Sequence, residues 1–313
     1  MKRKISVFIL CLGLLQIAAA QGIDIRLDTR YSFTALEDRT YGFQGDYLNL
    51  RITGSVNENF SYAFQQRLNK PVIANNLFNA TDWVYLLYRK NHWGFQAGKM
   101  MLEYGGYEFD EAPINLYWCS QMWNNFESAF IFAVNGHYYL DNGNEFLFQI
   151  SQSPYVERSF GMKLAYNLAA KGSAGFYSWK HSLNLFDLPD SGQVGSIVLG
   201  NCFTAGPARL ELDIYQRGNM SSFKLFDDIS VSANFVYSFK DWMNVIAKTT
   251  YDCNYSQYDP LIPVYGEFLS YGGGFEFFPN RDSKDIRIHA LYYHSEQSVL
   301  FVGLTWRIHL LQQ

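Results

Sequence analysis

The chain lacks long apolar runs, has few cysteines and carries no basic excess, and each absence excludes a class of protein. Apart from the first twenty residues, no stretch approaches the ~20 apolar residues that a transmembrane helix needs. Cys119, Cys202 and Cys253 are widely spaced with no C-x-x-C pair, which argues against a zinc site and a disulfide framework. These cysteines are either incidental or joined in a single bridge.

The first twenty residues, MKRKISVFILCLGLLQIAAA, have the layout of an export signal. A basic head (residues 2–4) precedes a short apolar run (5–15), and Ala18 and Ala20 form an A-x-A cleavage pattern. We expect residues 1–20 to be cleaved and residues 21–313 to be one exported domain. Cleavage removes three of the 25 basic residues, which leaves 22 against 29 acidic residues, a formal charge of −7. This balance argues against nucleic acid as a partner.

Aromatic residues are abundant, at 18% of the chain, with 26 Phe, 23 Tyr and 7 Trp. An exported, aromatic-rich chain without long apolar runs is typical of an outer-membrane barrel. In such a barrel only half of each strand is apolar, and aromatic girdles mark both membrane interfaces.

The stretch IDIRLDTRYSF (23–33) alternates in the way that a half-buried strand does. Its odd positions are apolar or aromatic apart from Thr29, and its even positions carry Asp24, Arg26, Asp28 and Arg30. Charges on a lipid face would cost ~2–4 kcal/mol each near the midplane, so we expect this row to face a wet lumen. Similar alternation elsewhere gives sixteen expected strands, some of them weaker, including 159–168 and 173–182.

The expected connections alternate in length. Short ones lie near residues 58, 91, 141–144, 170–172, 205–207, 241 and 280–283, and the intervening ones, such as 35–46, 101–125 and 183–193, are mostly longer. Short turns at one end and longer loops at the other are typical of bacterial outer-membrane barrels. The sequence therefore predicts an all-β fold, a transmembrane antiparallel β-barrel of about 16 strands. A barrel of this width leaves an aqueous channel.

The third long loop, MLEYGGYEFDEAPINLYWCSQMWNNF, is acidic. It contains Glu103, Glu108, Asp110 and Glu111 and no Lys or Arg. In sixteen-stranded porins the third loop folds into the lumen and narrows it, and we expect the same here. The alternative is an ordinary surface loop or a protein-contact loop.

Four runs carry a family resemblance: QQRLNKP (65–71), NLFNATDWVYL (76–86), FQAGK (95–99) and GGYEFDEAPIN (105–115). They resemble the phosphate-selective porin O and P family, in its Bacteroidetes branch. The resemblance implies a sixteen-stranded porin of the Gram-negative outer membrane. It also implies a homotrimer, which is the common assembly in this family, and contact with outer-membrane lipid. The expected activity is conduction of small hydrophilic solutes or ions without a cofactor.

The residues themselves do not favour strong selection for phosphate. Selection of an anion requires rings of positive charge along the lumen, because rings of one sign set which ions pass. The expected constriction is acidic, and no dense lysine cluster is evident. Basic residues do lie in inward phase on the expected first three strands and on the last one: Arg26, Arg30, Arg51, Arg67 and Arg307. Acids on the loop opposite arginines on the wall would create an electric field across the channel opening. Such a field selects only weakly between cations and anions. Alternatively, these arginines are solvated wall residues paired with Asp24 and Asp28.

Three functions remain open. The favoured one is a passive porin, without a chemical step. The second is a binding or structural barrel whose lumen is closed by the third loop. The third, an enzyme, is disfavoured because no serine lies in a G-x-S-x-G context and the six histidines lack helical metal spacing.

Overall fold

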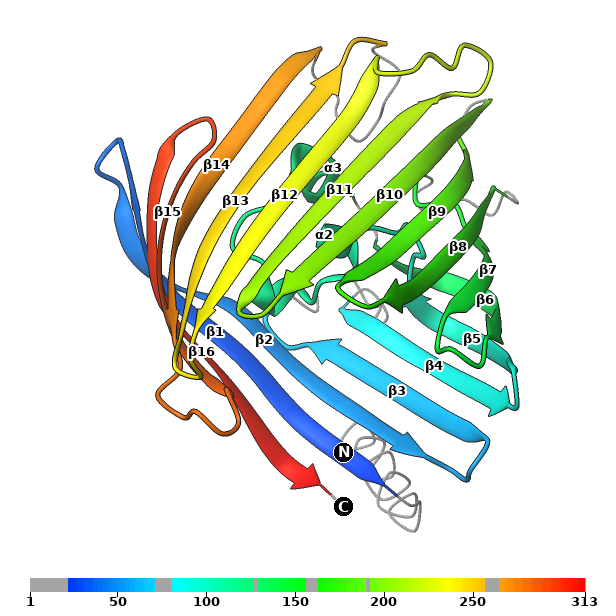
Figure 1. Ribbon diagram of the computed structural model, residues 1–313, viewed down its shortest axis with the longest axis horizontal. Helices are drawn as coiled ribbons and strands as arrows, with labels where there is room; N and C mark the ends of the chain where they lie inside the picture. The colour runs from blue at the N-terminus through cyan, green and yellow to red at the C-terminus, as the bar shows by residue number, and fades with distance from the viewer. Residues whose placement is uncertain are drawn as a thin grey trace, which may run out of the picture.

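The computed structural model describes residues 22–70, 80–126, 129–155, 163–189, 192–256 and 265–312. In this part of the chain, sixteen antiparallel strands form one closed sheet, and β1 pairs with β16 (Figure 1). The strands are β1 (Ile23–Leu36), β2 (Tyr41–Ser55), β3 (Phe60–Arg67), β4 (Thr81–Lys90), β5 (Trp93–Met101), β6 (Phe130–Tyr139), β7 (Glu145–Gln152), β8 (Leu164–Ala174), β9 (Tyr177–Asp187), β10 (Gln193–Ala205), β11 (Ala208–Asn219), β12 (Asp228–Phe239), β13 (Met243–Asn254), β14 (Gly266–Phe277), β15 (Ile286–His294) and β16 (Ser298–Gln312). The predicted sixteen-stranded barrel is confirmed.

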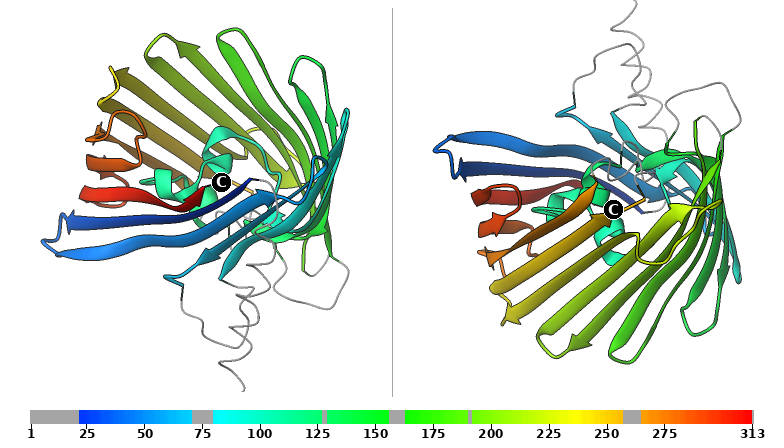
Figure 2. Two further views of the ribbon diagram at one scale, coloured as in Figure 1. Left: turned by 90° about the horizontal axis from the view of Figure 1, so that it is seen from below. Right: turned by 90° about the horizontal axis from the view of Figure 1, so that it is seen from above.

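The three described helices all belong to the connection between β5 and β6. They are α2 (Tyr107–Asp110), the 3-10 helix η3 (Pro113–Asn115) and α3 (Gln121–Asn124). Both end views place this connection inside the ring of strands (Figure 2). We call residues 102–126 the inserted loop. Among the described residues, no helix is long and apolar enough to cross a membrane.

The alternation of short turns and longer loops is present, but several expected bounds are wrong. The turn expected at 170–172 lies instead between Ala174 and Tyr177, where Gly175 has a φ of 61°. The connections expected at 35–46 and 183–193 shorten to 37–40 and 188–192 because the flanking strands continue beyond them.

The register sets which side chains face the lumen. Asp28 lies opposite Asn49 on β2 and opposite Arg307 on β16, so these three polar side chains share the inner face. Tyr31, at an outward position of β1, is 49% exposed, whereas neighbouring Arg30 is 9% exposed. The row of charges predicted from residues 24–30 therefore faces inward.

Aromatic rings gather on the outside at the short-turn end of the barrel. Trp93 and Tyr138 lie with ring centroids 4.8 Å apart beside one turn, and Tyr237 and Phe239 lie 5.1 Å apart beside another. Trp and Tyr are enriched where a barrel meets the polar boundary of the bilayer. The outer positions between the two ends also carry exposed apolar side chains, and we call this surface the apolar belt.

Candidate functional site: the inserted loop and the lumen wall

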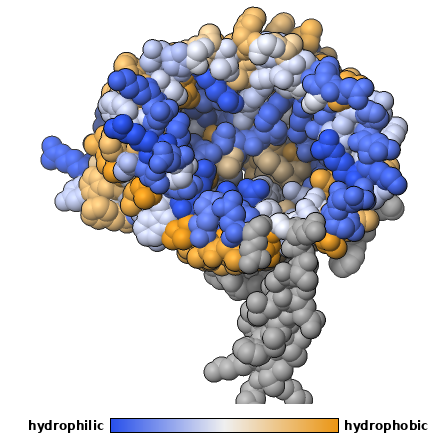
Figure 3. All heavy atoms as spheres, turned by 60° about the horizontal axis from the view of Figure 1, so that its bottom comes forward, coloured by the Kyte–Doolittle hydropathy of each residue, from blue (hydrophilic) through white to orange (hydrophobic). Residues whose placement is uncertain are grey.

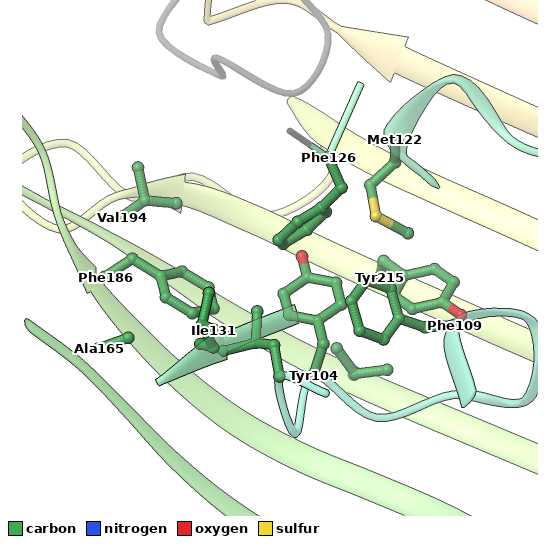
Figure 4. Packing of buried hydrophobic residues seen from close by; sticks show 11 residues of the cluster. Tyr104, Phe109, Met122, Phe126, Ile131, Ala165, Phe186, Val194 and Tyr215 are labelled. Atoms are coloured by element: carbon green, nitrogen blue, oxygen red, sulfur yellow. The ribbon is translucent and has the colours of Figure 1, made fainter. Parts of the chain in front are cut away.

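The inserted loop is fixed to one side of the lumen by an apolar cluster (Figure 4). The loop contributes Leu102, Tyr104, Phe109, Met122 and Phe126, and strands β6 and β8–β11 contribute Ile131, Ala165, Phe186, Val194, Val198 and Tyr215. Burying one such side chain contributes about 1.5–3 kcal/mol. The cluster occupies this side of the lumen, while hydrophilic side chains line the hollow visible from the turn end (Figure 3).

Two wall aspartates bind the amino ends of the two short α-helices of the loop. Asp213 on β11 accepts hydrogen bonds from the backbone N–H of Tyr107, at 2.8 and 2.9 Å, and of the next residue, at 2.7 Å. Asp252 on β13 accepts from Gln121 at 2.8 Å and from the next residue at 3.3 Å. The first N–H groups of a helix have no partner inside it, so these carboxylates complete both helices. They also fix where the loop crosses the lumen.

Three of the four predicted loop acids pair with lysines on the wall, and two of them share Lys171. Lys171 on β8 lies 2.5 Å from Glu103 and 3.4 Å from Asp110, and Lys180 on β9 lies 3.1 Å from Asp110. Burial raises the pKa of Asp110, but the two lysines lower it by more, so its pKa lies below the ordinary value. Asp110 is therefore a charged anchor of the loop.

The third acid, Glu108, is almost completely buried in another ion pair. Lys248 on β13 lies 2.7 Å from its carboxylate, and Ser120 donates to the same carboxylate from both N–H and hydroxyl. The fourth, Glu111, accepts hydrogen bonds from the Asn115 amide and from the following backbone N–H. Of the four acids, Glu108 and Glu111 border the turn-end cavity defined below.

The central stretch of the loop, residues 113–116, is held by arginines from the opposite wall. Arg30 donates to the carbonyls of Ile114 and Leu116, at 3.0 and 2.7 Å. Arg287 on β15 donates to the Ile114 carbonyl, and Arg307 on β16 to the Asn115 amide oxygen, both at 3.0 Å. These guanidinium groups contact neutral loop oxygens rather than the loop acids, so the loop is fixed by different chemistry on its two sides.

The remaining predicted arginines bind groups of the wall. Arg26 lies 2.8 Å from Asp28, and Arg67 lies 2.8 Å from Asp82 on β4. Arg51 lies over an indole ring of β4, 4.7 Å from its centroid. The alternative of wall arginines paired with Asp28 describes Arg26, and also Arg307, which lies 3.8 Å from Asp28 while it reaches the loop. Arg67 pairs with a different acid, and Arg30 reaches the loop. No arginine in this set faces a loop acid directly.

The sequence reading missed the lysines that neutralise the loop. Lys171 falls in the wrongly expected turn at 170–172, and Lys180 and Lys248 lie on strands with weak alternation. Correct strand phase would have placed all three on the inner face. The sequence predicts no dense lysine cluster, and the lysines of β8, β9 and β13 lie instead in ion pairs with acids of the loop.

The three cysteines in the described part of the chain take no part in a bridge. Cys119, Cys202 and Cys253 are all free, so the single-bridge alternative is wrong. Burial raises the pKa of Cys119 to about 12, so this thiol stays protonated at neutral pH.

Two cavities lie on either side of the loop stretch 116–118. The loop-end cavity, of about 560 Å³, is bordered by β1–β3, by β14–β16 and by the turn at 295–297. The turn-end cavity, of about 330 Å³, is bordered by β11–β16 and by Phe278, Lys284 and Asp285 of a short turn. Among the described residues, only Leu116, Tyr117 and Trp118 border both cavities. Tyr117 donates to Glu276 at 2.6 Å, which fixes this divider to the wall.

Comparisons with known proteins give the same architecture. A family model described as phosphate-selective porin O and P matches residues 20–178. The trimer form of in-vitro folded OmpT from Vibrio cholerae matches with a TM-score of 0.65 at 12% identity, over 92% of this chain and 99% of that one. A mutant porin from Rh. blastica matches with a TM-score of 0.57 at 15% identity, over 91% and 100%. No curated protein sequence matches, and at these identities the structural likeness shows the fold alone.

Proposed function

The chain belongs to the phosphate-selective porin O and P family, and we propose that its solutes pass between the inserted loop and the polar side of the barrel wall. Family and fold together make it an outer-membrane channel of the porin class. Its passage is passive, with no chemical step, and serves small hydrophilic solutes or ions.

One observation carries the proposed path. The two cavities open from opposite ends of the barrel and share the divider 116–118, on the side of the lumen that the apolar cluster does not fill. A solute entering from the loop end meets Arg30 first and Arg287 after the divider. The constriction is therefore the gap beside Leu116–Trp118. Five of the residues predicted to line the pore border its approaches: Arg30, Arg67, Glu108, Glu111 and Arg307. The other four contact residues of the wall: Arg26, Arg51, Glu103 and Asp110.

Weak selectivity by sign follows from the lining charges. Counted over the described residues, five basic and six acidic residues line the turn-end cavity, and two of each line the loop-end cavity. A balanced lining creates no ring of one sign, which strong ion selection requires. The arginines nearest the divider already donate to loop oxygens, so they form no free ladder for phosphate. We propose a general diffusion channel rather than a phosphate channel.

The remaining assignments are also proposals. Residues 1–20 would be the cleaved export signal, and residues 21–313 the single barrel domain. A homotrimer is supported by the family and by the trimer form of Vibrio cholerae OmpT, whose fold this chain shares. Outer-membrane lipid would contact the apolar belt.

Reconstitution of the refolded protein in a planar bilayer tests the proposal. We expect stepwise single-channel currents at both voltage signs, with near-linear conductance against salt at moderate concentration. We also expect no block by micromolar phosphate. A folded barrel that never conducts would favour the binding or structural alternative, and hydrolysis of lipid or peptide would favour an enzyme. Block by micromolar phosphate would show that the channel selects phosphate, as the family name says.

A further inference from the structure

The loop-end cavity differs in chemistry from the rest of the proposed path. Of the eighteen described residues that line it, five are aromatic: Tyr47, Tyr117, Trp118, Trp123 and Tyr293. Only four of the eighteen are charged, against eleven of 23 in the turn-end cavity. A channel lined only for ions and water has no need of aromatic carbon at its mouth, so this composition points to an organic solute.

Three of the four charged residues that line this cavity are paired within the protein, and the fourth, Glu296, is an exposed acid. Arg30 lies 3.4 Å from Asp46, and Arg67 lies 2.8 Å from Asp82. Arg30 also donates to loop carbonyls. A phosphate or carboxylate entering the cavity would have to displace these partners. The lining therefore fits a neutral guest better than an anion.

The neutral polar side chains that border the loop-end cavity indicate which class of ligand it would bind. Side chains with both donor and acceptor capacity border the cavity beside the aromatic rings: Gln121, Asn124, Ser270, Ser295 and Gln297. Trp118 and Tyr293 stack with centroids 5.1 Å apart and planes at 12°, so each ring covers one face of the other and the pair is held in place. Sugars present apolar C–H faces to aromatic rings and hydroxyl groups to amides. A cavity of about 560 Å³ lies in the size range of small-molecule sites.

We propose that the loop-end cavity is a subsite for a neutral saccharide of one or two rings, through which the channel concentrates sugars ahead of the constriction. This inference rests on the proposed channel function. Binding must be weak, because a solute that leaves slowly would block the path that it is meant to use.

Maltose titration of single-channel current in potassium chloride tests the subsite. We expect saturable current reduction in the millimolar range, and Trp123→Ala should raise the half-blocking concentration about three- to tenfold through loss of ring contact. Trp123→Phe, which keeps a ring, should recover most of the affinity. Trp93→Ala is the matched control, because Trp93 is 56% exposed on the outer surface. Salt conductance and heat-modified gel mobility report folding of each variant.

Each outcome decides the proposal. Sugar-insensitive current in a conducting wild type overturns it, and so does equal maltose block in wild type, Trp123→Ala and Tyr293→Ala. Calorimetry of the detergent-solubilised barrel separates the two proposals. Maltose binding by a barrel that never conducts would support the sugar subsite and contradict the channel function. Conduction without maltose binding would support the channel function and contradict the subsite.

Discussion

Gly106 of the inserted loop lies directly against Gly200 of β10. A Cβ built on Gly200 would lie 2.7 Å from the Gly106 Cα, and one built on Gly106 would lie 2.2 Å from the Tyr215 hydroxyl oxygen. Gly106 has a φ of 83°, a conformation that side chains rarely adopt, and its N–H donates to the Lys180 carbonyl at 3.1 Å. The loop backbone therefore reaches the wall only because neither contact position carries a side chain.

Gly200→Ala should displace the inserted loop from the wall. The added methyl group has no space, and overpacking of this kind costs about 1–3 kcal/mol. We expect a lower thermal midpoint of unfolding and larger, noisier single-channel conductance. Gly136→Ala on β6 is the control, because nothing lies within 4 Å of its Cβ position. Unchanged conductance in Gly200→Ala would show that the contact does not position the loop.

Removing Lys248 alone should destabilise the folded barrel more than removing both Lys248 and its partner Glu108. Lys248→Met leaves the buried Glu108 carboxylate without its cation, and breaking a buried pair costs about 3–5 kcal/mol. The double variant Lys248→Met with Glu108→Leu should recover much of that loss. Thermal unfolding of the two variants in detergent measures the difference. Equal midpoints for both would mean that the pair is not desolvated.

Neutralising the loop acids should shift selectivity toward anions. Within the described residues Glu111 forms no ion pair, so Glu111→Gln removes a negative charge from the turn-end cavity. Adding Glu108→Gln and Asp110→Asn frees wall lysines and should enlarge the shift. Reversal potentials across a salt gradient report it, and the shift should shrink at high salt as the Debye length falls. Asp282→Asn in an exposed turn should cause none. If the triple variant matched wild type, the loop would not line the path.

Lowering the pH should weaken the attachment of the inserted loop to the wall by protonating Asp110. Its pKa is lowered in the folded protein, so its charge stabilises docking above the unfolded value of about 3.9. That contribution is lost as pH falls through the lower folded pKa. We expect wild-type current noise to rise as pH falls below about 4. Asp110→Asn should be noisier at neutral pH and change less on acidification. An identical pH profile in both would remove Asp110 from the docking mechanism.

The sequence alone gave a false turn at 170–172 for an identifiable reason. Gly172 resembles a turn residue but lies within β8, where a Cβ would meet Trp179 at 2.5 Å and Asn144 at 2.4 Å. The glycine is needed for close packing rather than for a turn. The two requirements are indistinguishable in a single sequence, and the error hid the inward phase of Lys171.

What the sequence determined by itself was the barrel: its closure with an even strand number, its lipid and lumen faces, and its porin family. The closure and the two faces follow from period-2 alternation and from connection lengths, and the family follows from the resemblance of short runs within residues 65–115; all of these are local properties of the chain. Only the tertiary structure decided which charges meet. Glu108 and Lys248 are brought within 2.7 Å by insertion of the loop into the closed sheet, although 140 positions separate them in the chain. No local pattern encodes such a pair, because the partner of an inward side chain depends on which part of the loop reaches it.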